Sequence, residues 1–99
     1  DAAEARIINK VFGTEVDRLA AYSIKGAIGN ALGGAAAIQL AAASLGLRDG
    51  IVLPTVNWRT PDPNCRLNLS STVRYLPHSS VLINSHGRGG ENAAIVLTR

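Results

Sequence analysis

The chain of 99 residues contains no methionine, one cysteine and few aromatic residues, which make up 4% of the sequence. A single cysteine, Cys65, excludes an internal disulfide and a cysteine-rich zinc site, and it fits a reducing cytoplasmic compartment. A complete translated chain normally opens with methionine, whereas this one opens with Asp1. We therefore expect a fragment or a processed product of a larger protein.

The sequence also lacks strong charge of either sign. Its formal net charge is +3, and the ten basic residues, eight of them arginine, are scattered along the chain. Few aromatic side chains lie between them, so the pattern does not favour nucleic-acid binding. The polar N-terminal residues do not resemble a signal peptide.

Residues 26–47 carry no charge and are numerous enough to span a bilayer. The stretch nevertheless holds Asn30, Gln39 and Ser44, and it consists mainly of alanine and glycine rather than large apolar residues. We therefore predict a buried helix in a soluble protein, from about residue 31 to residue 47, and no membrane span. Because this helix is apolar nearly all round, we expect it to be covered on every side.

Hydrophobic periodicity predicts the other elements. Residues 1–12 place Ala3, Ile7 and Val11 on one stripe, which indicates an amphipathic helix that Gly13 ends. The remaining predicted segments are a short strand in 16–23, a glycine-rich turn at 25–30, a proline-rich loop at 51–68, a brief strand at 66–69 and two β-type runs at 80–85 and 92–98.

The two β-type runs flank a glycine-rich turn, residues 86–91, which predicts an antiparallel hairpin. The second run is continuously apolar over residues 93–97, as in a strand covered on both faces. The order helix, strand, helix, strands indicates a layered α/β unit. Such a unit needs more cover than 99 residues offer, so we expect it to pack against a partner.

Four stretches carry motifs in a defined order, and together they cover nearly the whole chain. They are residues 1–13, residues 23–47 with the loop Lys-Gly-Ala-Ile-Gly-Asn, residues 48–65 with three prolines, and residues 84–93 with Asn-Ser-His-Gly-Arg-Gly-Gly-Glu-Asn-Ala. They resemble, respectively, the helix after the His-Gly-Thr-Gly-Thr motif, the Lys-x-x-x-Gly-His loop with its helix, the proline-bearing connection, and the closing Asn-Ser-Phe-Gly-Phe-Gly-Gly-x-Asn hairpin of the β-ketoacyl synthases. Each motif alone is weak, but four at the family's spacing are strong evidence.

This resemblance implies that residues 1–99 form the C-terminal segment of a thiolase-like fold, incomplete without an N-terminal portion. The nucleophilic cysteine and the first active-site histidine would lie upstream of Asp1. The implied reaction transfers an acyl group to that cysteine, decarboxylates a malonyl thioester held on an acyl carrier protein, and joins the resulting carbanion to the acyl group. The implied partners are the chain's own N-terminal portion, a ketosynthase in a homo- or heterodimer, and the acyl carrier protein, with no cofactor and no metal.

Three residues stand at the family's active-site loop and helix. Lys25 matches the conserved lysine, which would supply positive potential, although a surface lysine at a turn is the alternative. Asn30 occupies the histidine position; its amide can still donate a hydrogen bond to a thioester carbonyl, or it simply caps the following helix. Gln39 replaces a glutamate that balances the lysine charge, or is a neutral polar residue on a buried helix.

At the hairpin, His86 and Arg88 stand where the family has phenylalanines, with Gly87 and Gly89 beside them. The second phenylalanine is a gate and its backbone N–H helps to bind the oxyanion, a role that Arg88 could keep through its own N–H. The alternative is a tip that faces solvent or a subunit interface, with Arg88 paired to Glu91. Cys65 is not at the nucleophile position, and His78 with His86 lacks further metal ligands.

The joint change at positions 30, 39 and 88 favours a non-condensing subunit that resembles a chain-length factor and pairs with an active ketosynthase. The other reading is an active condensing enzyme with a Cys-His-Asn arrangement. A separate hypothesis places a chain cleavage before Asp1, after which this chain stays docked to its own N-terminal portion.

Overall fold

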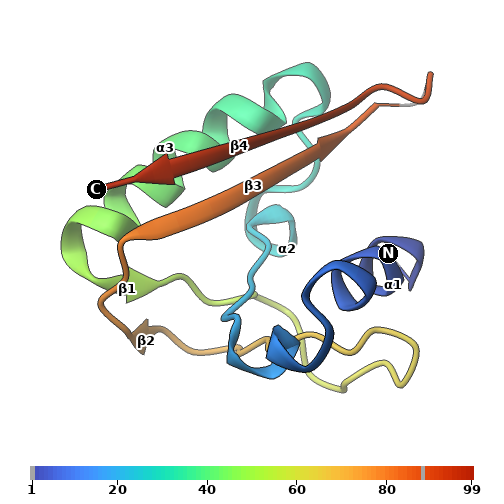
Figure 1. Ribbon diagram of the computed structural model, residues 1–99. Helices are drawn as coiled ribbons and strands as arrows, with labels where there is room; N and C mark the ends of the chain where they lie inside the picture. Colours follow the sequence, from blue (N-terminus) through green and yellow to red (C-terminus); the bar gives the residue numbers. More distant parts are fainter. Residues whose placement is uncertain (1, 88) are drawn as a thin grey trace.

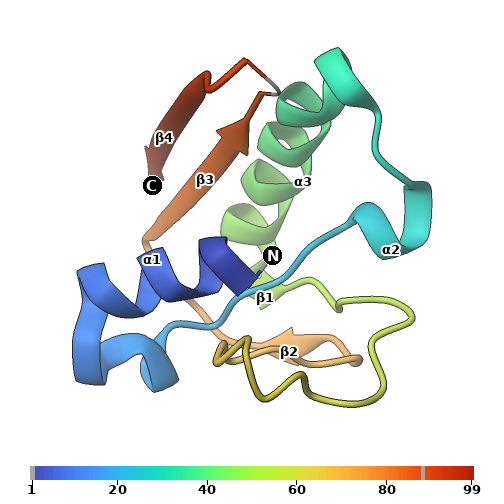
Figure 2. The same ribbon diagram turned by 90° about the vertical axis from the view of Figure 1, so that its right-hand side faces the viewer.

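The computed structural model describes residues 2–87 and 89–99. In chain order the elements are α1 (Ala2–Phe12), the 3-10 helix η1 (Gly13–Arg18), α2 (Lys25–Ile28), the 3-10 helix η2 (Leu32–Gly34), α3 (Ala35–Asp49), β1 (Ile51–Val52), β2 (Arg74–Tyr75), β3 (Ser80–His86) and β4 (Asn92–Thr98). The views in Figures 1 and 2 agree that α3 runs alongside the β3–β4 hairpin, with β1 and β2 below them. The predicted α/β class is confirmed.

The β3–β4 hairpin has the predicted antiparallel pairing, from Ser80 opposite Thr98 to His86 opposite Asn92. Side chains alternate between the faces of a strand, so one face of β3 carries Ile83 towards α3, and that residue is buried. A second, smaller antiparallel pair joins β1 to β2, which the sequence did not predict. The hairpin therefore forms one layer and α3 the layer beside it.

The α3 helix consists mainly of alanine and leucine, the residues with the highest helix propensity. The helix was predicted from about residue 31 to residue 47. It begins later, because residues 32–34 form the short η2 turn, and it ends at Asp49 with Gly50 as its C-cap. In the part of the chain that the structure describes, no helix is both long and apolar enough to cross a membrane.

The buried core is small and lies in two places. One part is where α3 packs against β3 and β1, and the other is where α1 packs against η1. The apolar residues that are almost inaccessible are Ala5, Val16, Ala43, Leu47, Val52 and Ile83. The α3 layer thus carries its own core, and α1 is joined to the rest mainly through loops.

The strand predicted within residues 16–23 is wrong in its first half, because η1 extends to Arg18 and buries Val16 against α1. The chain is extended only from Leu19 onward, and Ala20 forms a single parallel bridge with Asn68. The brief strand predicted at 66–69 is reduced to that bridge. The turn predicted at 25–30 contains one full helical turn, α2.

These irregular segments are joined by hydrogen bonds from the Arg74 guanidinium rather than by the ladder of a β-sheet. Its Nη1 donates to the Asn68 carbonyl at 3.2 Å, and its Nη2 donates to the Ala21 carbonyl at 2.9 Å. Asn68 in turn donates through Nδ2 to the Asp17 carbonyl at 3.0 Å. One side chain of β2 therefore satisfies backbone acceptors of two separate segments.

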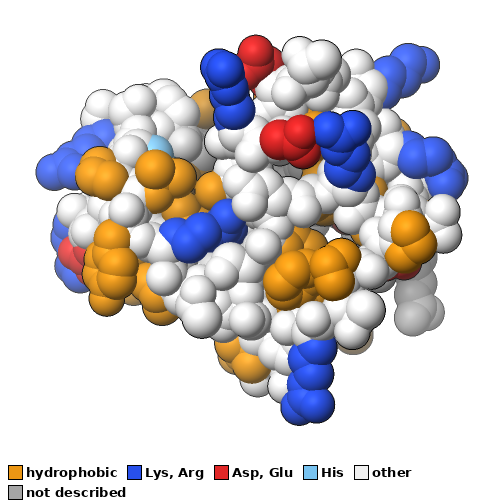
Figure 3. Space-filling view, turned by 90° about the horizontal axis from the view of Figure 1, so that it is seen from below, with side chains coloured by type: hydrophobic (Ala, Val, Ile, Leu, Met, Phe, Trp, Pro, Cys, Tyr) orange, Lys and Arg blue, Asp and Glu red, His pale blue; other side chains and the backbone are white. Residues whose placement is uncertain are grey.

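The chain by itself does not supply the predicted all-round cover of α3 or the predicted two-sided cover of β4. On α3, Ile38 and Leu45 are 41% and 51% exposed, and on β4, Ile95 and Val96 are 44% and 62% exposed. Within the described residues, α3 packs against β3, β1 and η2, which leaves its other sides open. Elsewhere on the surface, Figure 3 shows hydrophobic side chains in small patches between Lys and Arg side chains.

Candidate active-site loop and hairpin

The loop that contains Lys25 is a single helical turn ended by a glycine. The Gly29 N–H donates to the Lys25 carbonyl at 2.8 Å and closes the turn. Gly29 has φ +74° and ψ −176°, a backbone conformation that is essentially restricted to glycine. The backbone of the loop therefore requires a glycine at position 29, the glycine of the Lys-x-x-x-Gly motif.

The other glycine of the loop, Gly26, lies directly against the segment 55–57. The Asn57 Nδ2 donates to the Gly26 carbonyl at 2.8 Å, and a Cβ atom on Gly26 would overlap the Val56 carbonyl oxygen. Ser23 N–H donates to Thr55 Oγ1 at 3.2 Å, which fixes the entry to the loop. The sequence predicted only a proline-rich loop at 55–57, and no pattern in it indicated the contact with Gly26.

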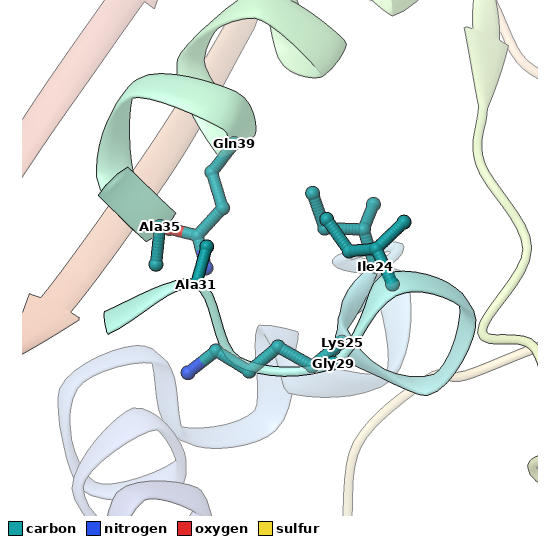
Figure 4. Close-up of a pocket in the computed structure, with 7 residues that line it drawn as sticks. Ile24, Lys25, Gly29, Ala31, Ala35 and Gln39 are labelled. Atoms are coloured by element: carbon teal, nitrogen blue, oxygen red, sulfur yellow. The ribbon is translucent and has the colours of Figure 1, made fainter. Parts of the chain in front are cut away.

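Lys25 and Gln39 line the same small hollow between the loop and the start of α3. Figure 4 shows the Gln39 side chain reaching from α3 towards Ala31 and Ala35, with Lys25 on the loop opposite. The hollow has a volume of about 10 Å³, which is room for one water at most. Its lining residues are Ile24, Lys25, Ile28, Gly29, Ala31, Ala35 and Gln39. No carboxylate is among them, so the lining of the hollow holds no group that would balance the charge of Lys25.

Asn30 is exposed, and its side chain turns back to the chain rather than into the hollow. Its Oδ1 accepts a hydrogen bond from the Leu32 N–H at 2.9 Å, an Asx turn that leads into η2. Within the described residues, no hydrogen-bond partner contacts the Nδ2 of Asn30. The oxygen thus supports the turn into η2, and the donor group is left available. The predicted capping of the following helix is wrong, because α3 begins at Ala35 with Gly34 as its N-cap.

Leu32, immediately after this turn, has φ +52°. A bulky residue seldom adopts this left-handed conformation, which costs about 1–3 kcal/mol. The bond from its N–H to Asn30 holds it there. The backbone between Asn30 and α3 is therefore held in a strained shape beside the candidate site.

The hairpin places His86 and Gly87 at the end of β3 and Gly89 in the turn. The Gly87 N–H donates to the Glu91 carbonyl at 2.6 Å, so this N–H is occupied within the turn. A Cβ atom on Gly87 would lie 2.8 Å from the Glu91 carboxylate, which folds over the turn. Arg88 lies outside the described residues, and with it the gate position, its backbone N–H and the predicted pairing with Glu91.

His86 makes two contacts that the sequence did not indicate. Its Nδ1 lies 2.6 Å from Asn92 Oδ1, and its Nε2 lies 3.6 Å from Glu4 Oε1 on α1. His78 is elsewhere, with its Nδ1 2.7 Å from the Leu76 carbonyl, and Cys65 lies in the loop, half-buried. Over residues 2–87 and 89–99, no three His, Cys, Asp or Glu side chains gather as a metal site would require.

The fold and these two sites define the C-terminal part of a thiolase-like α/β protein, in which a lysine loop leads into a helix beside a glycine-rich hairpin. Residues 1–59 match the family described as "Beta-ketoacyl synthase, C-terminal domain". The chain therefore belongs to the β-ketoacyl synthase family, as the sequence motifs predicted.

Individual relatives agree along the whole chain. It is 38% identical to the 3-oxoacyl-[acyl-carrier-protein] synthase 2 of Coxiella burnetii over 100% of this chain and 24% of that protein. It is 30% identical to nodulation protein E of Rhizobium leguminosarum bv. trifolii over 98% of this chain and 24% of that protein. The chain thus spans about a quarter of the length of these curated relatives.

A solved structure gives the same fold. It is a type II polyketide synthase acyl-carrier protein in complex with its ketosynthase, which is bound to the hexaketide. The TM-score is 0.91 at 32% identity, over 96% of this chain and 24% of that chain. The chain therefore has the fold of the corresponding quarter of that ketosynthase chain.

Proposed function

We propose that this chain is the C-terminal segment of a ketosynthase-like subunit that does not condense acyl groups itself, but pairs with an active ketosynthase and shapes its acyl tunnel, as a chain-length factor does. Its further partners would be its own N-terminal portion, without which it is incomplete, and an acyl carrier protein. The exposed apolar residues of α3 and β4 support the need for an N-terminal portion.

The geometry of Asn30 carries this proposal. The residue occupies the histidine position of the motif, and its oxygen is engaged with the Leu32 N–H in the turn that leads into η2. An amide neither gains nor loses charge in the physiological pH range, so it cannot act as the acid or base that a histidine can be. Lys25 and the neutral Gln39 line the hollow beside it, where the family motif has a lysine and a glutamate that balances its charge.

The decisive test uses the full-length polypeptide without a partner. We expect it neither to take up radiolabelled acyl groups from an acyl carrier protein nor to condense them with a malonyl thioester. Added to a catalytically competent ketosynthase, it should form a heterodimer and change the length distribution of the products. Condensation by the isolated polypeptide would refute the proposal.

One observation favours a second candidate, an active condensing enzyme with a Cys-His-Asn arrangement. Within the described residues, the Nδ2 of Asn30 contacts no hydrogen-bond partner, so it could donate to a thioester carbonyl as negative charge develops. In this case the cysteine and the histidine would come from the N-terminal portion, and Lys25 would add positive potential.

Two variants of Asn30 separate its structural role from a catalytic one. Asn30→Asp keeps an oxygen for the Leu32 N–H but removes the amide donor, whereas Asn30→Ala removes both. We expect Asn30→Ala to lower the free energy of unfolding by about 1 kcal/mol and Asn30→Asp to lower it less. If malonyl decarboxylation by the full-length protein survives both changes, the Cys-His-Asn mechanism is excluded; a loss of about 100-fold or more in both supports it.

A further inference from the structure

We propose that Asn57 is a positioning residue for Lys25, because its amide caps the one-turn helix that begins at Lys25. The helix is α2, and the capping amide comes from a loop residue 31 positions after Gly26. A helix of a single turn is unstable by itself, so contacts from other segments must hold it. The contact goes beyond the proposed function, and only the importance of Lys25 rests on that function.

The carbonyl of Gly26 lies at the open end of α2, where a helix leaves its last carbonyls without partners. The backbone N–H groups of residues 27–29 donate to the carbonyls of Ile24 and Lys25. Within the described residues, no backbone N–H donates to Gly26. Asn57 Nδ2 donates to this carbonyl at 2.8 Å and supplies the donor that the helix lacks.

The backbone of Asn57 favours a narrow choice of residue at this position. Its φ is +68°, and in the described part of the chain Leu32 is the other non-glycine residue with a positive φ. Asparagine, aspartate and glycine tolerate this left-handed conformation better than other residues do. Of these three, only asparagine also has a side-chain N–H that can donate to a carbonyl. Asn57 therefore meets both requirements of the site.

The loop that carries Asn57 is itself anchored, so the cap has a fixed base. The Thr55 N–H donates to the Ser70 carbonyl at 2.8 Å. Thr55 Oγ1 accepts from the Ser23 N–H at 3.2 Å, and Ser23 Oγ accepts from the Lys25 N–H at 3.3 Å. Residues 55–57 thus hold the start of α2 through Ser23 and its end through the cap. Lys25 lies between these two contacts.

Two variants remove the cap and keep a residue that suits the backbone. Asn57→Asp has nearly the same shape but cannot donate, and Asn57→Gly has no side chain. In both, the amides of residues 25–29 in the full-length protein should exchange with deuterium about three- to tenfold faster, because a hydrogen bond that holds the turn is lost. The amides of β3, residues 80–86, should exchange as before. Unchanged exchange at residues 25–29 in both variants would overturn the proposal.

A signal from Lys25 itself separates positioning from a general loss of stability. We expect the nuclear magnetic resonance signal of Lys25, in full-length protein with carbon-13 at the lysine Cε and assigned through Lys25→Arg, to shift in both Asn57 variants. The signal of Lys10, on α1, should stay in place. A Lys25 signal that does not shift in either variant would overturn the proposal, whatever the exchange rates.

Asn64 provides the matched controls, Asn64→Asp and Asn64→Gly. It is an exposed asparagine of the same loop, and its side chain forms no hydrogen bond within the described residues. Both controls should leave residues 25–29 and the Lys25 signal unchanged; equal effects at both asparagines would contradict the role of Asn57. If Asn57→Asp does not fold, Asn57→Gly decides. Neither measurement needs an acyl substrate, so each can fail while the proposed function stands, and the reverse also holds.

Discussion

At the scale of single residues, the space around Gly26 limits what the lysine loop tolerates. A Cβ atom there would overlap the Val56 carbonyl oxygen, and a backbone atom cannot rotate away as a side chain can. We therefore expect Gly26→Ala to lower the free energy of unfolding by about 1–3 kcal/mol, as other overpacking changes do. Urea denaturation of the full-length protein measures this.

Gly33→Ala is the matched control for this change. No atom lies within 4 Å of a Cβ built on Gly33, and the residue is part of the η2 turn. Here the added methyl group should leave stability unchanged or raise it by up to about 1 kcal/mol. Equal losses for both variants would show that the close approach of Val56 does not constrain the loop.

Burial also sets the titration of one residue near this loop. It raises the pKa of Tyr22, because desolvation disfavours the phenolate. A raised pKa in the folded state means that stability is fully present below the pKa of the unfolded chain, about 10, and falls as pH rises above it. We expect Tyr22→Phe to reduce this alkaline loss of stability, whereas Tyr75→Phe, at a tyrosine that is 86% exposed, should not. Thermal unfolding between about pH 8 and about pH 11 compares them.

At the scale of elements, the side chain of Arg74 joins two segments that no β-sheet connects. Arg74 donates to the carbonyls of Asn68 and Ala21 from two different nitrogens, a geometry that a single ammonium group cannot reproduce. Arg74→Lys should therefore lower the free energy of unfolding by about 1–3 kcal/mol. Arg59→Lys is the control, since Arg59 is exposed and, within the described residues, forms no ion pair or side-chain hydrogen bond. An Arg74→Lys variant whose free energy of unfolding is unchanged would contradict this role.

The same elements show what could be predicted from the sequence. The hairpin and α1 follow from local periodicity and from the glycines that end them, and they were predicted nearly to their ends; α3 was predicted too, but it begins four residues later than expected. Val16 was assigned to a strand because an apolar residue in a short segment does not distinguish a strand from a turn packed on a helix. Contacts such as Asn57 with Gly26 and Glu4 with His86 join distant segments, and no local pattern encodes them.

The sequence predicted which residues belong to the candidate site, but not which atoms they contact. The motif spacing placed Lys25 and Gln39 in one region, and the structure lines one hollow with both. It did not show that Asn30 turns its oxygen to Leu32, because that depends on a backbone with φ +52° at Leu32. Side-chain direction is set by strained backbone here, and such strain has no sequence signature beyond the neighbouring glycines.

At the scale of the whole molecule, the exposed apolar residues of β4 lead to the last prediction. Val96 is 62% exposed on a strand whose sequence is typical of two-sided burial. If the N-terminal portion covers this strand, a protein cut at a protease site inserted before Asp1 should keep both pieces together. Size-exclusion chromatography with intact mass should then find the chain eluting with its N-terminal portion.

Val96→Asp should break this association, because covering an unpaired carboxylate costs at least about 3 kcal/mol, which weakens binding more than 100-fold. Thr98→Asp, at the exposed end of the same strand, adds the same charge where less cover is expected and should weaken association less. The alternative is that β4 remains open to solvent in the full protein. In that case the cut protein would release a 10.3 kDa monomer without any substitution, and the N-terminal portion would not be what completes this fold.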